Sequence, residues 1–504
     1  MQIHKLTVWQ EGKSREVLFS GTPLLSRVLD EQGYSLPHPC GGRGRCGKCG
    51  VELKGMVSPP NEAEVKAGVR LSCQTVLLGD CEVFLLPERR MEQIQLDGQV
   101  QPLTLRPMPG RFGAAIDIGT TTLALKIFDL QTGTLSGSAA APNPQAAVAA
   151  DVMGRIGAAM DGGLIRLQKM IQNALSRLLK EACRDAGIGK EEVETLVIAG
   201  NTAMLYLLTG QDTAPLSRAP FTADRLFDEW VTLLNREAYL PPCMDAFVGA
   251  DISCAVLASG MCGIDETALL IDAGTNGEIA LWKQGALFVC STAAGPAFEG
   301  AGIHMGCGSV SGAVDSVSIS AGGVLNVHTI LGAPAIGVCG SGLIDALACF
   351  LKQGQIDETG ASMKEKLFIT PSVYLIPRDV RSAQLAKAAI AAGIRTLLQY
   401  AGVGISQVRT LYLAGGFGSR LNVRNAAAIG LIPSELADRA RVIGNAALTG
   451  AGMLLLDTEN LKEIRRVAEL SRHVSLGGNP VFNQAYMEEM LFPEPGRESE
   501  GKTL

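Results

Sequence analysis

The chain has 504 residues, a net charge of −6 at pH 7, 47% hydrophobic residues and 59 glycines. This length and apolar content allow two to four domains with full cores, and the lack of a basic patch argues against nucleic acid as a partner. No apolar run approaches 18 residues, and the polar, alternating N-terminus is unlike a signal peptide, so we expect a cytoplasmic protein without a membrane span. The many glycines indicate an α/β protein with tight turns.

A glycine-rich loop near the N-terminus carries three cysteines, Cys40, Cys46 and Cys49, and a fourth, Cys73, follows in the segment Arg-Leu-Ser-Cys-Gln. Three close thiols and one distant thiol are the pattern of a [2Fe–2S] ferredoxin loop, although the first gap is one residue longer than in the plant type. A zinc site would usually show a second C-x2-C pair, which is absent. We predict that these four cysteines hold a [2Fe–2S] cluster, with zinc and structural thiols as the alternatives.

Residues 1–88 are predicted to form a small β-rich domain. Its expected elements are strands at 2–9, 15–20, 50–54 and 81–86 and a helix at 24–32. This order resembles the β-grasp ferredoxins, and Cys81 is interpreted as a core residue of the last strand. Residues 89–112 are polar and contain prolines, which indicates a semi-rigid linker that lets the cluster move between electron donor and acceptor.

Two later stretches repeat one pattern, an apolar strand, an Asp-x-Gly-Thr turn and a second apolar strand. The first contains Asp117, Gly119, Thr120, Thr121 and Thr122, and the second contains Asp272, Gly274, Thr275 and Asn276. Amides and hydroxyls of such a turn can cradle phosphate oxygens, and an aspartate at the strand end can hold Mg²⁺ through water. Each stretch alone is equally an ordinary β-hairpin, but their repetition predicts a duplicated fold with a nucleotide between the halves.

A third strand ends in a glycine turn at Gly415, Gly416 and Phe417, where the backbone can lie flat against an adenine ring. The three motifs in this order resemble the acetate and sugar kinase/Hsp70/actin superfamily, in which the first two turns hold phosphates and the last holds adenosine. The resemblance implies a two-lobed actin-like ATPase fold. Its expected parts are a first lobe at 113–262, a second lobe at 263–493, a flexible tail at 494–504 and connecting helices at 198–204 and 444–451.

The segments between the motifs agree with this fold. Helices are predicted at 164–187, 251–261, 383–400 and 459–474, a strand at 195–199, and hairpins at 281–289 and 316–327.

Two further glycine-rich loops carry polar side chains. One holds Glu299 and His304, and an axial ligand or a proton relay is one hypothesis for the histidine. The other holds Ser341, which is expected to cap a following helix whose N-terminus could accept a nucleotide phosphate. Three cysteines, at 290, 307 and 339, could gather near the pocket, although buried cysteines are common small hydrophobic residues.

A ferredoxin-like domain joined to this kinase-like fold resembles the reductive activators of corrinoid proteins, which combine an N-terminal [2Fe–2S] domain, a linker and an ATPase core. The resemblance covers nearly the whole chain. Beyond the motifs above, the matching segments are 143–145, 151–156, 249–252, 293–300, 337–342 and 378–381.

This resemblance implies ATP-requiring one-electron transfer from the cluster to the Co(II) of a corrinoid protein in a methyltransferase system, which gives Co(I). It implies a [2Fe–2S] cluster, ATP and Mg²⁺ as cofactors, with Asp117 and Asp272 as catalytic carboxylates. The expected partners are a corrinoid protein as electron acceptor and a reduced flavin or ferredoxin-type protein as donor, and a homodimer is left open.

Other functions fit the same motifs. A kinase of a small metabolite could use the ferredoxin domain as a sensor, and an interaction module of the chaperone or actin kind could use a slow ATPase to gate partner binding. Another ATP-driven electron donor, such as a dehydratase activator, is a third alternative, but those resemble homodimers with a bridging [4Fe–4S] cluster. Formation of Co(I) that depends on both ATP and the cluster distinguishes the corrinoid activator from all three.

Overall fold

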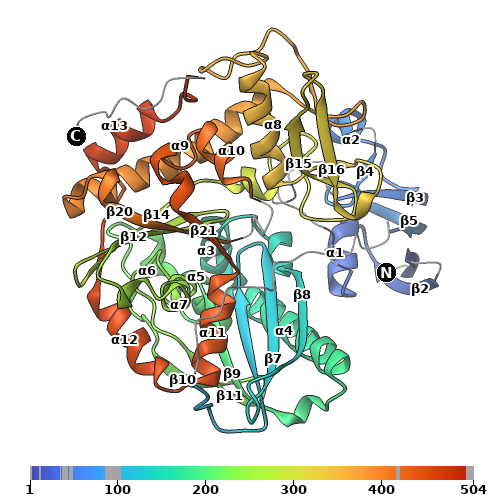
Figure 1. The fold of residues 1–504 in the computed structure, drawn as a ribbon. Coiled ribbons are helices and arrows are strands. Elements are labelled where there is room, and N and C mark those ends of the chain that lie inside the picture. The colour runs from blue at the N-terminus through green and yellow to red at the C-terminus, as the bar shows by residue number, and fades with distance from the viewer. Residues whose placement is uncertain are drawn as a thin grey trace.

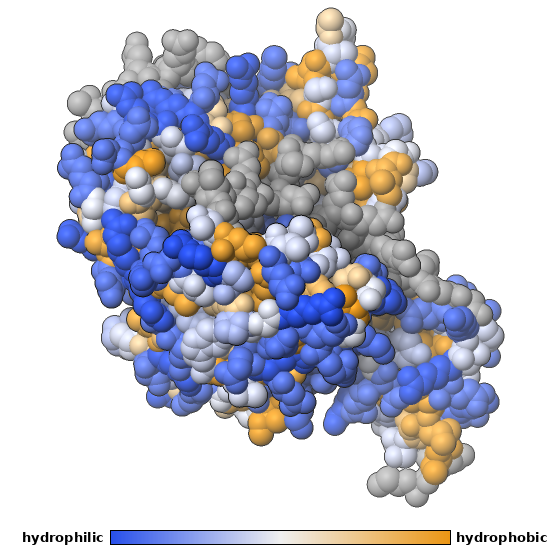
Figure 2. All heavy atoms as spheres, turned by 60° about the horizontal axis from the view of Figure 1, so that its bottom comes forward, coloured by the Kyte–Doolittle hydropathy of each residue, from blue (hydrophilic) through white to orange (hydrophobic). Residues whose placement is uncertain are grey.

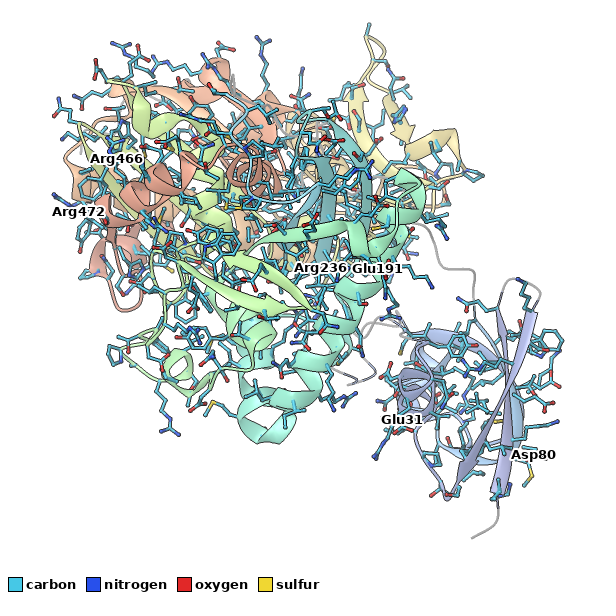
Figure 3. All side chains as sticks on the ribbon, turned by 90° about the horizontal axis from the view of Figure 1, so that it is seen from below. Glu31, Asp80, Glu191, Arg236, Arg466 and Arg472 are labelled. Atoms are coloured by element: carbon cyan, nitrogen blue, oxygen red, sulfur yellow. The ribbon has the colours of Figure 1, made fainter. Side chains whose placement is uncertain are left out.

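The computed structural model describes residues 3–10, 13–34, 36, 42, 44, 49–67, 69–85, 104–415 and 421–494. They form a small N-terminal domain beside a larger body of two lobes, and the small domain projects from one side of that body (Figures 1 and 3). This arrangement confirms the predicted fold class, a ferredoxin-like domain followed by a two-lobed α/β body. No helix in these ranges is long and apolar enough to cross a membrane.

The N-terminal domain is a five-stranded sheet in the order β2-β1-β5-β3-β4 with one main helix packed on it. Its elements are β1 (Ile3–Gln10), β2 (Lys13–Ser20), α1 (Leu25–Glu31), β3 (Gly50–Val57), α2 (Glu62–Ala67), β4 (Arg70–Leu71) and β5 (Leu77–Phe84). Alternate residues of β1 and β5 point inward, so Leu6, Val8, Cys81 and Val83 form a core with Leu29 of α1. The predicted strands, the helix and the core position of Cys81 are confirmed, whereas α2 was not predicted.

The first lobe is built on a six-stranded sheet in the order β10-β11-β9-β6-β7-β8. Its strands are β6 (Phe112–Ile118), β7 (Thr122–Asp129), β8 (Leu135–Pro142), β9 (Val193–Gly200), β10 (Glu229–Leu233) and β11 (Arg236–Leu240). Its helices are α3 (Val152–Ala158), α4 (Leu164–Ala186), α5 (Thr202–Thr209), α6 (Ala214–Ser217) and α7 (Ala250–Ser259). The amphipathic α4 covers the sheet through its apolar face and ends before Gly187, as predicted, and this glycine adopts a left-handed conformation.

The second lobe contains another six-stranded sheet, in the order β21-β20-β12-β13-β14-β22. Its strands are β12 (Thr267–Ala273), β13 (Gly277–Lys283), β14 (Ala286–Thr292), β20 (Val408–Ala414), β21 (Ala440–Gly444) and β22 (Ser471–His473). Two smaller sheets contain β15 (Ala313–Ile319), β16 (Leu325–Thr329) and β17 (Gly337–Val338), and β18 (Leu367–Phe368) and β19 (Tyr374–Leu375). The helices are α8 (Gly340–Lys352), α9 (Pro377–Ala401), α10 (Val423–Ala428), α11 (Ala446–Leu456), α12 (Asn460–Leu470) and α13 (Pro480–Glu488).

The two large sheets repeat one arrangement, which supports the predicted duplication. In the first lobe β6, β7 and β8 form an antiparallel meander and β9 pairs with β6 in parallel. In the second lobe β12, β13 and β14 form the same meander and β20 pairs with β12 in parallel. Each predicted phosphate turn therefore occupies the same hairpin of its own lobe.

Helices α7 and α11 pack against each other between the two lobes, so they form the joint of the molecule. The contact is close because residue 450 is a glycine, and a Cβ there would overlap the carbonyl oxygen of Cys254. The prediction of a connecting helix at 444–451 is confirmed by α11. The prediction at 198–204 is wrong, because α5 packs on α4 and the partner of α11 is α7.

The predicted helix at 459–474 is shorter than expected. It ends with α12 at Leu470, and the next three residues form β22, which pairs in parallel with the edge strand β14. The unpaired backbone groups of a sheet edge attract such an added strand, which the helical pattern cannot reveal.

The surface of the molecule is mixed in character. Figure 2 shows a face on which hydrophilic side chains predominate and apolar side chains are dispersed. Figure 3 shows Glu31 of α1 on the side of the small domain that faces the lobes and Asp80 on the opposite side. The contact with the lobes includes Asp30, whose carboxylate lies 3.9 Å from Arg166 of α4.

Candidate nucleotide site and iron–sulfur loop

The first predicted phosphate loop connects β6 to β7 and is fixed by polar side chains of its own lobe. Arg155 donates to the carbonyl oxygen of Thr120 at 2.6 Å, and Asn143 donates to that of Gly119 at 2.8 Å. Asn201 donates to the Thr120 hydroxyl at 3.2 Å. Gly119 is required, because a Cβ there would lie 2.7 Å from the carbonyl oxygen of Thr122. The turn is therefore held in one shape before any ligand binds.

The second predicted loop connects β12 to β13 and is held mainly by its own backbone and by one carboxylate. The amide of Gly274 donates to the carbonyl of Asn276, and the amide of Gly295 donates to that of Thr275, each at 2.9 Å. The Thr275 hydroxyl donates to Glu299 at 2.7 Å. Glu299 ends the short 3₁₀ helix η5 (Pro296–Glu299) of the same lobe.

The two loops face each other across the joint between the lobes. The hydroxyl oxygens of Thr121 and Thr275 lie 3.3 Å apart, and both hydroxyls contact the same oxygen of Glu299. The structure thus brings together two turns that are separated by about 155 residues in the sequence. This is the geometry required if both loops are to contact one phosphate chain.

Between the loops lies a cavity of about 220 Å³. Five carboxylate side chains line it, and no Lys, Arg or His occurs among the described residues of its wall. They are Asp117, Asp251, Asp272, Glu278 and Glu299. A polyphosphate could bind in so acidic a cavity only with its charge neutralised, so the wall favours a nucleotide accompanied by a divalent cation.

Burial raises the pKa values of three of these acids, and repulsion by neighbouring carboxylates adds to the rise in two of them. Burial raises the pKa of Asp117 to about 6, although a 2.9 Å hydrogen bond from Asn445 opposes this. Burial, together with the charges of Asp117 and Glu299, raises the pKa of Asp272 to about 7. The pKa of Asp251 rises to about 8 through burial and the charges of Asp272 and Asp117. A bound cation would favour the ionised forms of all of them.

The carboxylates do not form a metal cage by themselves. Within the described ranges, no three His, Cys, Asp or Glu side chains lie close enough to hold a metal ion. A Mg²⁺ ion in this cavity would therefore depend on phosphate oxygens and water for most of its ligands, which is the usual arrangement for this ion. Asp117 and Asp272 lie near the corresponding ends of β6 and β12, and both line the cavity.

Other walls of the cavity come from the second lobe. The N-terminus of α8 contributes Cys339 and Ser341, and the third predicted motif contributes Gly415. A Cβ at Gly415 would overlap a carboxylate oxygen of Asp272, so the turn approaches the second loop closely. Gly416 and Phe417 lie outside the described residues. Ser341 was predicted to cap α8, but the cap residue is Cys339, and the serine hydroxyl instead donates to the carbonyl of Asp315 at 2.8 Å.

The other sequence candidates lie at different distances from the cavity. Cys307 lines it, whereas Cys290 is buried in the core of the second lobe. His304 is absent from the wall, and its ring nitrogen lies 3.3 Å from the Tyr374 hydroxyl.

Two of the four predicted cluster ligands lie in the described part of the small domain, and the structure places them together. The sulfur atoms of Cys49 and Cys73 are 3.2 Å apart and buried, and Gln74 donates to the carbonyl of Gly42 at 2.6 Å. Gly42 and Gly44 have φ angles of 74° and 68°, the left-handed region that favours glycine. Paired thiols beneath a loop of this kind fit a [2Fe–2S] cluster. Cys40 and Cys46 lie outside the described residues.

A buried carboxylate fixes the segment that carries Cys73. Glu64, 2% exposed, accepts hydrogen bonds from the Leu71 amide, the Thr75 hydroxyl and the Arg70 guanidinium at 2.7–3.0 Å. Burial favours a higher pKa for this carboxyl, but the hydrogen bonds together hold the pKa below its ordinary value. Glu64 therefore positions the last thiol by anchoring the turn on which it lies.

Several site residues were not identified from the sequence. Asn201, Asp251, Glu278 and Asn445 line the cavity, and Asn143 and Arg155 support the first loop. All but Glu278 occur in segments that the family resemblance covers or in a predicted connecting helix, so the signal was present as a motif without an assigned role. Glu278 follows the second loop directly.

Models of known protein families match most of the chain. Residues 9–78 match the model of the 2Fe–2S iron–sulfur cluster binding domain, 112–263 match the RACo middle region, and 266–501 match the C-terminal domain of RACo, the ASKHA domain. The small domain is thus a 2Fe–2S binding domain, and the second lobe belongs to an ATPase fold.

Three relatives support the assignment. The corrinoid activation enzyme RamQ of Eubacterium limosum is 31% identical over 422 residues, which cover 76% of this chain and 70% of the relative. The [Co(II) methylated amine-specific corrinoid protein] reductase of Methanosarcina barkeri is 26% identical over 76% of this chain and 77% of its own. A solved structure of a reductive activator for a corrinoid, iron–sulfur protein superposes with a TM-score of 0.72 at 27% identity, covering 97% of this chain and 98% of the other. The chain therefore belongs to the family of reductive activators of corrinoid proteins.

Proposed function

We propose that this protein reduces the cobalt of an inactivated corrinoid protein from Co(II) to Co(I), one electron at a time, in a reaction that requires ATP. The observation that carries the proposal is the pair of phosphate loops that meet across an acidic cavity in a chain that also has a cluster-binding domain. The names of the relatives support a corrinoid protein as the substrate, and the cavity between the phosphate loops supports the requirement for ATP.

The energetics explain why an electron carrier would need a nucleotide site. Plant-type clusters have reduction potentials of about −400 mV. Each 100 mV by which the reduction potential of the acceptor lies below that of the donor costs about 2.3 kcal/mol for the transfer of one electron. Nucleotide binding or hydrolysis that changes the complex between the two proteins could offset such a gap, and two lobes that close on the nucleotide would provide the element with two arrangements.

The residues divide between the two tasks. Cys40, Cys46, Cys49 and Cys73 would hold the cluster, which supplies one-electron chemistry. The phosphates would be held by Thr120, Thr121, Thr122, Thr275 and Asn276. Asp117 and Asp272 would orient Mg²⁺, and the turn at Gly415, Gly416 and Phe417 would lie against the adenine. The electron donor would be a reduced flavin or a ferredoxin-type protein, in a cytoplasmic setting.

The structure suggests how the two tasks are linked. Helix α11 is capped by Asn445, whose side chain donates to Asp117 in the cavity. It is followed by Asp457, which accepts hydrogen bonds from Nε and Nη2 of Arg106, each at 2.9 Å. Arg106 and Met108 also donate backbone hydrogen bonds to the end of this helix. The described end of the predicted linker is thus tied to a helix whose other end contacts the phosphate site.

The test is direct. The reduced protein is mixed with a Co(II) corrinoid protein, and Co(I) absorbance is followed with and without Mg-ATP. We expect Co(I) only with ATP, and no Co(I) with the Cys46→Ser variant, which should still bind ATP. The matched control is Cys81→Ala, which removes a core thiol of the same domain and should keep the cluster. Formation of a phosphorylated small molecule without Co(I) for any corrinoid partner would refute the proposal.

A further inference from the structure

Glu299 makes a contact that the phosphate loops would be expected to reserve for a ligand. One of its carboxylate oxygens accepts the Thr121 hydroxyl at 2.6 Å and the Thr275 hydroxyl at 2.7 Å. Thr121 belongs to the first lobe, whereas Thr275 and Glu299 belong to the second. The carboxylate therefore joins the two lobes at the point where their phosphate loops meet.

The position of Glu299 is fixed by its surroundings. The segment η5 packs against the start of α8 so closely that a Cβ at Gly340 would overlap the carbonyl oxygen of Phe298. The next residue, Gly300, has a φ of 75°, and a Cβ there would overlap the backbone of Cys307. The backbone of this segment is therefore constrained, and the contact of the Glu299 side chain with Thr121 depends on the relative position of the lobes.

The chemistry of the contact is that of an anion subsite. Two hydroxyls that converge on one carboxylate oxygen would converge equally well on one phosphate oxygen. Glu299 also adds to the repulsion that raises the pKa of Asp272, so its negative charge is felt at the second loop. A phosphate group in the same place would be repelled by this carboxylate and would compete for its two hydroxyl donors.

We propose that Glu299 is the residue that distinguishes a nucleoside triphosphate from a diphosphate, because its carboxylate occupies the subsite of the terminal phosphate and must be displaced when that phosphate binds. Displacement breaks the Thr121–Glu299 contact and frees the first lobe from the second, whereas a diphosphate does not reach the subsite. This inference rests on the proposed nucleotide function and adds to it the group that senses the terminal phosphate.

The test compares the binding of two probes, Mg-ADP and a Mg-bound non-hydrolysable ATP analogue, by calorimetry with the full-length protein. The variant Glu299→Gln keeps the shape of the side chain and removes its charge. We expect the ATP analogue to bind at least about fivefold more tightly to this variant than to the wild type, while ADP binding changes less than about twofold. Glu299→Ala, which removes the competing group altogether, should show the same selective gain.

The control is Glu266→Gln, which removes an exposed carboxylate just before β12 and should alter neither affinity. In the nucleotide-free protein, a double variant with Thr121→Val tests the contact itself, because the effects of the two substitutions on the free energy of unfolding should not add if they break one interaction. Unchanged or weaker binding of the ATP analogue to both Glu299 variants would overturn the inference, and equal gains for ADP and the analogue would also overturn it. None of these measurements uses a corrinoid protein, so their failure would leave the proposed reduction untouched.

Discussion

The two phosphate loops occupy equivalent hairpins of a duplicated fold, yet they are supported in opposite ways. The first is held by the buried guanidinium of Arg155 and the amides of Asn143 and Asn201, all from its own lobe. The second has the carboxylate of Glu299 as its side-chain partner, and that carboxylate also reaches across to the first lobe. The first loop has hydrogen-bond donors bound to its backbone carbonyls, and the second loop has a carboxylate acceptor bound to its threonine hydroxyl.

This difference indicates a division of labour between the loops. Donors that satisfy the carbonyls of the first turn fix the shape of its backbone, which would preorganise that turn for a ligand. The second turn already contacts an anion, so its arrangement changes when a ligand replaces that anion. The first loop is also connected through Asp117 and Asn445 to α11, and so to the linker of the cluster domain. Each prediction below removes one part of this asymmetry.

The largest effect is expected from Arg155→Ala. This side chain is fully buried, and it donates to the carbonyls of Thr120 and Ala149. Burial lowers the pKa of Arg155 to about 10, which still leaves it charged at neutral pH. Removing it leaves two buried carbonyls short of a donor, so we expect the free energy of unfolding to fall by about 3 kcal/mol and ATP binding to be lost.

Chemical denaturation and calorimetric ATP titration measure both effects. The matched control is Arg177→Ala on the exposed face of α4, which should change stability by less than about 0.5 kcal/mol. Normal ATP affinity in a folded Arg155→Ala protein would show that the first loop does not need its buried donor, and the contrast between the loops would then lose its meaning.

The next effect concerns Asp251, which lies in the cavity and responds to the aspartates of both loops. Its pKa is raised to about 8, first by burial, then by Asp272 and then by Asp117. An acid with a raised pKa binds more protons in the folded than in the unfolded chain between about pH 4 and pH 8. The nucleotide-free protein should therefore lose stability as the pH rises through this window, and Asp251→Asn should remove part of that loss, about 2 kcal/mol at pH 8.

Unfolding free energies measured from pH 5 to pH 8 without nucleotide test this prediction. Because the charge of Asp272 acts on Asp251 more strongly than that of Asp117, Asp272→Asn should flatten the pH profile more than Asp117→Asn. The reverse order would contradict the view that the second loop carries the stronger negative field. A stability that rises from pH 5 to pH 8 would contradict the raised pKa itself.

Features that depend on a short stretch of residues could be predicted from the sequence. The repeated Asp-x-Gly-Thr turns and the cysteine spacing each lie within one short stretch, and the hairpins and the long α4 follow from apolar periodicity. The contacts that distinguish the two loops join distant residues, since Asn201 and Thr120 are 81 residues apart and Glu299 and Thr121 are 178 apart. No local pattern can show which side chain arrives behind a turn once the chain has folded.

The errors have the same origin. Ser341 follows a glycine before an apolar helix and matches the pattern of a cap, but the carbonyl of Asp315 from a neighbouring strand takes its hydroxyl instead. The strand β22 forms because the edge of β14 is available, and the pairing of α7 with α11 depends on the glycine at 450 meeting the backbone of Cys254. In each case tertiary contacts decided what local propensity left open.

A smaller effect is expected from Asn201→Ala, which removes a neutral donor from the first loop. The side chain also caps α5 by accepting the amide of Met204 at 3.0 Å. We expect a loss of stability of about 1 kcal/mol and a several-fold weaker binding of ATP, measured by denaturation and calorimetry. Asn479→Ala removes the equivalent cap of α13 and should cost similar stability without changing ATP affinity.

The smallest effect on stability, and the most informative about coupling, is expected from Arg106→Met. The pair with Asp457 is bidentate but half of the arginine is exposed, so its loss should cost little stability. ATP affinity should not change, because the first loop keeps Asn445 and Arg155. ATP-dependent Co(I) formation should nevertheless slow, because the linker is released from the helix that begins at the phosphate site. The control is Arg111→Met, which breaks an exposed ion pair between Arg111 and Glu192. An equal slowing in this variant would mean that any change near the linker slows Co(I) formation and that α11 has no special part in the coupling.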